Sequence, residues 1–220
     1  MWRVSTILGE AGLRKPFQGP ADRLAAGYRR GTALHAVLEA YAYGEQGPDA
    51  VPGLDEYVDG IRGWFDEFTP TVLFTERRVV NRRQRVTGRI DLGVLVDGEP
   101  VIVDLKRSDE QPWHAIQTVG YCDLADADEE LRDVARRCGA KSWRRANLYL
   151  PGNGRYHWET RVDPRDPFLW RSAVALTQWR YEHGVLTRLD PERPDDDQQI
   201  PAGSEDAIGP SGGDERQHPR

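Results

Sequence analysis

The sequence predicts an α/β fold in which helices flank a mixed β-sheet, and three observations support this prediction. Helix-like and strand-like segments follow one another in the order helix, three strands, helix, strand, strand, helix. The runs 86–96 and 101–106 are rich in Val, Ile and Leu, and the Asp97-Gly98 dipeptide between them is a strong hairpin signal. The helical segments carry apolar residues at helical spacing, as expected for helices that cover a sheet.

Local features of the sequence define each element. Pro70 ends a helix, and Pro-Gly-Asn-Gly at 151–154 is a dense turn signal between two strands. In the last helix, the residues predicted to face the core are Phe168, Leu169, Ala173, Leu176 and Trp179. Helices are predicted at 21–43, 54–68, 113–125, 128–138 and 166–183, and Gly31 could break the first of them. Strands are predicted at 72–80, 86–96, 101–106, 144–150 and 155–162. The remaining predicted segments are an amphipathic segment at 2–13, a loop at 15–20, a turn-rich loop at 44–53 and a basic turn at 81–85.

The composition predicts one domain at 1–189 followed by an acidic tail at 190–220. A chain of 220 residues is long enough for one sizeable core with tails. The tail is rich in Pro, Gly and Asp, so it cannot bury enough apolar surface to order itself. Its nine acidic and three basic residues account for the whole formal charge of −6. The rest of the chain is neutral, and net charge therefore does not exclude a nucleic-acid partner.

Membrane insertion and cysteine-based sites are not expected. No apolar run approaches the roughly 20 residues that a bilayer-spanning helix needs, and the N-terminus lacks the pattern of a secretory signal. We therefore expect a cytoplasmic protein. Cys122 and Cys138 are the only cysteines, too few for a disulfide scaffold or for a four-cysteine zinc or iron–sulfur site.

Asp91, Asp104 and Lys106 form the candidate catalytic group that the residues themselves suggest. Side chains alternate along a strand, so Asp104 and Lys106 project to the same face, and Asp91 lies on the neighbouring strand. Two nearby carboxylates repel each other when both are ionised, and Mg²⁺ or Mn²⁺ would relieve that repulsion. Such an ion can polarise a phosphoryl oxygen and lower the pKa of an attacking water, while Lys106 orients the water and neutralises developing charge.

Other residues could complete this group, but each also has an ordinary interpretation. His35 could add a nitrogen ligand, which would favour Mn²⁺ somewhat, although a lone helical histidine is more often a surface or core residue. Glu76 could simply pair with a neighbouring arginine. Gln117 and Tyr121 lie four residues apart on a helix, and such a pair usually has no role beyond packing or surface exposure. An Asp-x-Lys triplet also arises by chance, so the order and spacing of the whole set matter more than any member.

Four motifs occur in one order along the chain: GTALHAVLE at 31–39, GRID at 88–91, VDLK at 103–106 and QTVGY at 117–121. Together they resemble the PD-(D/E)xK nuclease superfamily, specifically its RecB-like branch. The segments TILGEAGL and RGTALHAVLEAY are also similar to N-terminal segments of the phage exonucleases in that branch. The resemblance covers roughly residues 1–185. An isoleucine stands at the position of the proline in the superfamily name, a form common among RecB-like members.

The resemblance implies a restriction-endonuclease-like core with a metal-dependent site. His35, Asp91 and Asp104 would be metal ligands, together with the backbone carbonyl of Leu105. Lys106 would be the catalytic lysine. The implied cofactor is Mg²⁺ or Mn²⁺, and no iron–sulfur cluster is expected because the four cysteines of the iron–sulfur members are absent.

The resemblance also assigns residues around the ligands. Gln117 and Tyr121 would lie beside the active site, where they contact DNA or position the lysine. Glu76 matches an acid on the strand before the glycine–aspartate motif, and Glu39 follows the histidine by one helical turn. Both glutamates would contact the metal ligands rather than the metal itself.

DNA contacts are expected on basic residues near the site, with an affinity that falls as salt rises. An aromatic residue beside the lysine could stack on a base or separate strands, although core packing is its commoner role. A solvated turn is the alternative for the arginines. The candidates are Arg29, Arg30, Arg77, Arg78, Arg82, Arg83, Arg85, Arg89, Arg107 and Trp113.

The sequence thus predicts a metal-dependent DNA exonuclease that hydrolyses phosphodiester bonds at linear ends and leaves a 5′-phosphate. Its context would be phage or bacterial recombination and repair, with a recombination annealing protein or a helicase as partner. Two alternatives remain. One is an endonuclease of the same fold, either a restriction or a structure-specific enzyme. The other is a DNA-binding subunit that lost catalysis, against which the intact set of acids and lysine argues.

Overall fold

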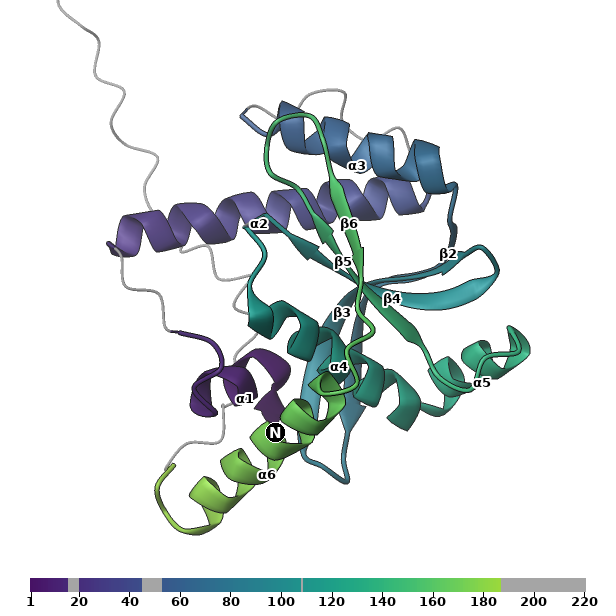
Figure 1. The fold of residues 1–220 in the computed structure, drawn as a ribbon. Helices are drawn as coiled ribbons and strands as arrows, with labels where there is room; N and C mark the ends of the chain where they lie inside the picture. The colour runs from purple at the N-terminus through teal and green to yellow at the C-terminus, as the bar shows by residue number, and fades with distance from the viewer. Residues whose placement is uncertain (16–19, 45–52, 108, 187–220) are drawn as a thin grey trace, which may run out of the picture.

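A six-stranded mixed sheet lies at the centre of the part of the chain that the structure describes (Figure 1). The computed structural model describes residues 1–15, 20–44, 53–107 and 109–186. β2, β3 and β4 form an antiparallel meander, β5 pairs parallel with β4, and β6 pairs antiparallel with β5. The strands are β1 (Trp2–Arg3), β2 (Thr71–Asn81), β3 (Val86–Val96), β4 (Glu99–Lys106), β5 (Arg144–Tyr149) and β6 (His157–Thr160). The predicted α/β fold with a mixed sheet is confirmed.

Helices cover both faces of this sheet. Figure 1 shows α2 and α3 on one side and α1, α4 and α6 on the other, and the buried apolar residues accordingly form two cores. No helix among the described residues is long and apolar enough to cross a membrane. The helices are α1 (Val4–Glu10), α2 (Ala21–Ala42), α3 (Asp55–Phe68), α4 (Pro112–Ala127), α5 (Glu129–Arg137) and α6 (Asp166–Glu182).

Strand β3 changes the face that it presents to each core at Asp91. Ile90 packs in the core under α1, α4 and α6, whereas Leu92 packs in the core under α2 and α3. Residues two apart on a regular strand face the same side, so the strand is locally distorted between them. The distortion is shared by β2, where Glu76 has a φ of 45°. The two strands thus bend together at two of the predicted site residues.

The N-terminal elements differ from the prediction in two places. The predicted amphipathic segment at 2–13 begins with a short strand that was not predicted, because the Trp2 amide donates to the Arg85 carbonyl at 2.7 Å and Trp2 pairs with Val86. Helix α2 runs through Gly31 without a break. The predicted loops at 15–20 and 44–53 lie mostly outside the described residues, and the acidic tail at 190–220 lies wholly outside them.

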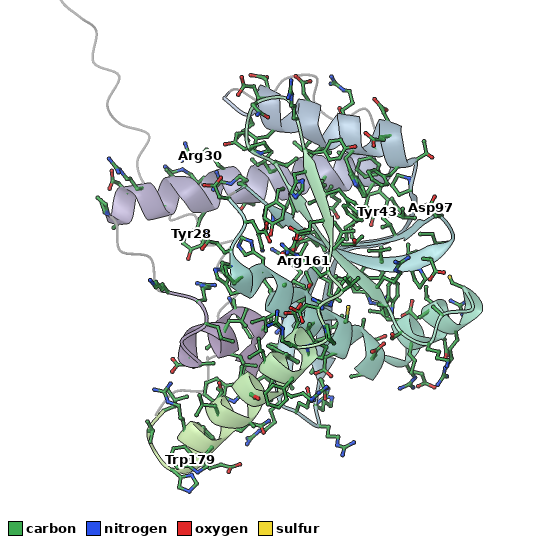
Figure 2. All side chains as sticks on the ribbon, viewed as in Figure 1. Tyr28, Arg30, Tyr43, Asp97, Arg161 and Trp179 are labelled. Carbon is green, nitrogen blue, oxygen red and sulfur yellow. The ribbon has the colours of Figure 1, made fainter. Side chains whose placement is uncertain are left out.

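The predicted core side of α6 is wrong for four of its five residues. Phe168, Leu169, Leu176 and Trp179 are exposed, with Trp179 52% accessible and at the edge of the molecule in Figure 2. The buried side carries Trp170, whose ring packs against Gly120 of α4, where an added Cβ would lie 3.0 Å from it. Apolar residues occupy both sides of α6, so periodicity could not identify the buried one.

The two faces of α6 should respond differently to truncation. Trp170→Ala should lower the free energy of unfolding by about 3–5 kcal/mol, because it empties a space between α6 and α4. Trp179→Ala should change it by less than about 0.5 kcal/mol, as expected for an exposed side chain. Urea denaturation followed by circular dichroism measures both. A larger loss for Trp179→Ala than for Trp170→Ala would contradict this orientation of α6.

Candidate functional site

Three side chains from different elements converge beside the bend in β2 and β3. His35 of α2, Glu76 of β2 and Asp91 of β3 each place one ligand atom within 4.8 Å of the others. The Nδ1 of His35 lies 2.8 Å from Oε1 of Glu76 and 3.8 Å from Oδ1 of Asp91. One imidazole and two carboxylates are a donor set that suits Mg²⁺ or Mn²⁺, with the nitrogen favouring Mn²⁺. The chemistry of these residues therefore fits a divalent cation.

Glu76 was predicted to lie behind the metal ligands, but its carboxylate stands among the possible ligand atoms. Its φ of 45° is in the left-handed region, which a residue with a side chain adopts at a cost. This backbone conformation brings Oε1 to His35, while Oε2 pairs with Nε of Arg89 at 3.0 Å. Strain of this kind persists where the surroundings enforce it, often at a functional site. Glu76 is thus a candidate ligand.

The Asp91 side chain accepts a backbone hydrogen bond where the pairing of β3 with β4 ends. The β3–β4 ladder ends at Leu92 and Val103, and the next amide, that of Leu105, donates instead to Oδ2 of Asp91 at 2.8 Å. This bond fixes the carboxylate and leaves Oδ1 on the side of His35. Burial raises the pKa of Asp91 and the charge of His35 opposes this rise. A buried carboxylate in this position is well placed to bind a cation.

Asp104 lies beside the three ligand candidates but is held by other partners. Nζ of Lys106 is 2.9 Å from its Oδ1 and 2.8 Å from its Oδ2, as expected for side chains that share a strand face. Burial raises the pKa of Asp104 to about 6, with Lys106 opposing the rise and Asp91 adding to it. The predicted ligand set of His35, Asp91 and Asp104 is therefore brought together only in part, because Asp104 pairs with the lysine.

Gln117 and Tyr121 are buried together on α4. Nε2 of Gln117 donates to the Tyr121 hydroxyl at 2.8 Å, and Oε1 of Gln117 is buried with no hydrogen-bond partner. Burial raises the pKa of Tyr121, and the charges of Asp104 and Asp91 raise it further. The Tyr121 hydroxyl is therefore close enough to both aspartates to be influenced by their charges.

Glu39 and Trp113 border the site. Oε1 of Glu39 accepts a hydrogen bond from the Thr75 hydroxyl at 3.3 Å, one residue before Glu76 on β2. The Trp113 ring is half-buried, and Nζ of Lys106 lies 5.5 Å from its centroid. The cation–π contact and the partial burial indicate that this ring packs against the lysine rather than standing free for a base.

The predicted DNA-binding arginines divide into three groups. Arg29 and Arg30 are exposed on α2, about 7–9 Å along the helix from His35 at 1.5 Å per residue. Figure 2 labels Arg30 on this helix. Arg89 and Arg107 hold elements together, Arg89 through Glu76 and Arg107 through the Gly27 carbonyl at 3.1 Å.

The remaining arginines lie away from the aspartates or have acidic partners. The turn between β2 and β3 carries exposed arginines six residues or more from Asp91, roughly 20 Å at 3.3 Å per residue. A cavity of about 950 Å³ beside this turn has lining residues of both charges. Arg77 pairs with Asp128 and Glu130, and Arg78 is exposed on β2. The exposed turn residues are Arg82, Arg83 and Arg85.

Cation binding should depend on the protonation of His35. Burial lowers the pKa of His35, but Asp91 and Glu76 outweigh it and raise the pKa from 6.5 to about 9. The imidazolium must release its proton before it can bind a cation. We expect the apparent Mg²⁺ affinity to rise about tenfold per pH unit from pH 7 to about 9 and then level off. Without a cation, the ion pairs of protonated His35 with Asp91 and Glu76 stabilise the fold fully below pH 6.5, and this stabilisation is lost as the pH rises through about 9.

Titration calorimetry in buffers of different ionisation enthalpy measures this release as about one proton per bound cation. His157→Gln, at an exposed histidine of β6, is the control and should leave the pH dependence unchanged. An affinity that does not change between pH 7 and 9 would contradict a role for His35 as a ligand.

The structure also reveals polar residues behind Asp104 that the sequence reading missed. Asn147 and Arg161 form a hydrogen-bond chain that ends on this carboxylate. Asn147 stands among the buried residues Ala146, Leu148 and Tyr149 of β5, and a buried amide in such a run needs a partner. That contrast was the signal in the sequence. Arg161 gave no comparable signal.

The site thus combines two groups, a histidine with two carboxylates and a lysine bound to a third carboxylate. The first group suits a divalent cation, and the second holds a positive charge on a buried strand beside it. Together they could bind and polarise an anionic substrate such as a phosphodiester. In comparisons with known proteins, no family model matches the chain and no curated protein matches it.

Proposed function

We propose that the protein is a divalent-metal-dependent deoxyribonuclease with a restriction-endonuclease-like core of the RecB-like PD-(D/E)xK type. The observation that carries the proposal is the Asp104–Lys106 pair beside the group of His35, Glu76 and Asp91. An acid and a lysine two residues apart on a buried strand, next to a cation-binding group, suit phosphodiester hydrolysis. The order of the motifs in the sequence supports the same class of enzyme.

Each residue has a role in this proposal. His35, Glu76 and Asp91 would hold the cation, and the neighbouring Asp104 would supply a further carboxylate ligand. A bound Mg²⁺ or Mn²⁺ would polarise the phosphoryl oxygen and lower the pKa of a water molecule. Lys106 neutralises charge that develops on the phosphate and orients the attacking water. Gln117 and Tyr121 keep the α4 side of the site closed beside the aspartates.

DNA would reach the site past the N-terminal half of α2. Arg29 and Arg30 are exposed there, and their charges can contact backbone phosphates without reading sequence. The arginines of the β2–β3 turn lie about 20 Å from the site, so they would contact DNA only if the bound duplex or strand extends that far from the reacting phosphate. We propose end-dependent cleavage in phage or bacterial recombination or repair.

A cleavage assay tests this function. Linear and closed circular DNA, single- and double-stranded and labelled at either end, are incubated with Mg²⁺, with Mn²⁺ or with a chelator. We expect degradation of linear DNA only, with the label released first giving the polarity. Cleavage of closed circles would replace the exonuclease by an endonuclease. If no substrate is cut under any metal, the proposed activity is wrong.

A further inference from the structure

The Asp104 carboxylate accepts a hydrogen bond from a side-chain amide that is itself held by a second partner. Asn147 stands beside Asp104 in the parallel β4–β5 register and is fully buried. Its Nδ2 donates to Oδ2 of Asp104 at 2.8 Å. A carboxylate can only accept when ionised, so the amide must present its nitrogen to it. This bond sets the plane of the Asp104 carboxylate.

Arg161 fixes the other end of that amide. Its Nε donates to Oδ1 of Asn147 at 2.8 Å, and the guanidinium has no acceptor atom. The amide is therefore bound through both its oxygen and its nitrogen, and a flipped orientation would place N–H against N–H. Figure 2 shows Arg161 near the centre of the molecule, where it lies just after β6.

Arg161 is in turn held by the elements around it. Its guanidinium pairs with Glu159 at 2.6 Å and with Glu110 at 2.7 Å, and it donates to the Tyr149 hydroxyl at 2.5 Å. Glu110 follows Lys106 by four residues, in the segment that leads into α4. The chain of bonds thus joins β6 and β5 to the strand that carries Asp104 and to the segment that follows Lys106.

We propose that Asn147 and Arg161 are positioning residues that hold the Asp104 carboxylate in the geometry that cation binding and catalysis need. Burying an amide and a guanidinium costs free energy that an apolar pair would avoid. Here the amide donates to a carboxylate that also binds Lys106, and the guanidinium acts on that carboxylate through the amide. Residues behind metal ligands typically change metal affinity or activity by about 10–100-fold when replaced. The inference rests on the proposed function, since it takes Asp104 as a site residue.

Three variants and a matched control test this inference. Asn147→Ala removes the amide, and Arg161→Lys removes the bond from Nε. Asn147→Asp keeps the shape of the side chain and a partner for Arg161, but it turns the donor toward Asp104 into an acceptor. The control is Asp166→Ala. The buried Asp166 carboxylate lies 2.8 Å from the guanidinium of Arg145, which is on the same strand as Asn147, so this variant also removes a buried polar partner from β5.

Mn²⁺ affinity is measured by electron paramagnetic resonance without DNA, followed by kcat and KM on linear DNA and by thermal melting. Asn147→Ala and Asn147→Asp should lower the Mn²⁺ affinity and kcat by about 10–100-fold each, with KM for DNA little changed. Arg161→Lys should show a smaller loss of the same kind. Asp166→Ala should lower the melting temperature and leave Mn²⁺ affinity and kcat at wild-type values.

Two results would overturn the inference. One is wild-type Mn²⁺ affinity and kcat in the Asn147 variants together with a lower melting temperature, which is the behaviour of a purely structural group. The other is an equal loss of Mn²⁺ affinity in Asp166→Ala. If the wild-type chain binds Mn²⁺ but cuts no DNA, the nuclease proposal fails, and the Mn²⁺ affinities alone decide the role of Asn147.

Discussion

Asp91→Asn should abolish cation binding at the candidate site and reduce DNA cleavage by about 10³-fold or more. Asparagine removes the charge that a cation needs, but its amide oxygen can still accept the Leu105 N–H that Asp91 accepts at 2.8 Å. The sheet should therefore keep its shape while the cation is lost. A metal ion supplies several kcal/mol of transition-state stabilisation, and each 1.36 kcal/mol is tenfold in rate.

Asp91→Ala should differ from Asp91→Asn in stability alone. It leaves the Leu105 amide buried without a partner, at a cost of about 1–3 kcal/mol. The control is Asp97→Asn at the tip of the same hairpin, exposed and labelled in Figure 2, which should keep full activity. Mn²⁺ binding, single-turnover cleavage and thermal melting separate the two effects. An Asp91→Asn variant that cuts DNA at the wild-type rate would exclude the proposed site.

Lys106→Met should reduce cleavage by about 10²–10⁴-fold while Mn²⁺ still binds. Methionine keeps much of the side-chain length but removes the amine that contacts both oxygens of Asp104. His35, Glu76 and Asp91 keep their positions and can still hold a cation. Loss of rate with retention of binding would distinguish a catalytic lysine from a structural one.

The pH dependence of this variant gives a second test. Lys106 lowers the pKa of Asp104, which burial raises to about 6, so removing the lysine should raise that pKa further. The residual activity should then increase as the pH rises above 7. Lys141→Met, at an exposed lysine, is the control and should match the wild type. If Lys106→Met loses Mn²⁺ binding and cleavage in parallel, the lysine has no separate catalytic role.

Local sequence signals were enough to predict the central hairpin. Val86–Val96 forms β3 as predicted, and β4 begins two residues earlier than the predicted 101–106. Asp97 and Gly98 have φ values of 52° and 80°, which are the positive values of a type I′ turn. The same regularity placed Asp104 and Lys106 on one face, because alternation along a strand is a property of the backbone itself.

Features that depend on long-range packing could not be predicted in this way. Nothing in the sequence around Glu76 marks a positive φ, which arises where β2 bends with β3. The buried face of α6 is set by how Trp170 meets Gly120, and both faces of the helix are apolar. The bond between Asn147 and Arg161 joins β5 to the residue that follows β6.

The position of His35 has a consequence for the whole fold. Glu76 and Asp91 belong to the sheet, whereas His35 belongs to α2, so a bound cation would act as a cross-link between a helix and the sheet. Such a cross-link adds RT ln(1 + [L]/Kd) to the stability, about 2.7 kcal/mol at a hundredfold excess of cation over Kd. The melting temperature would then report the free cation concentration, and amide exchange in α2 would slow as the cation is added.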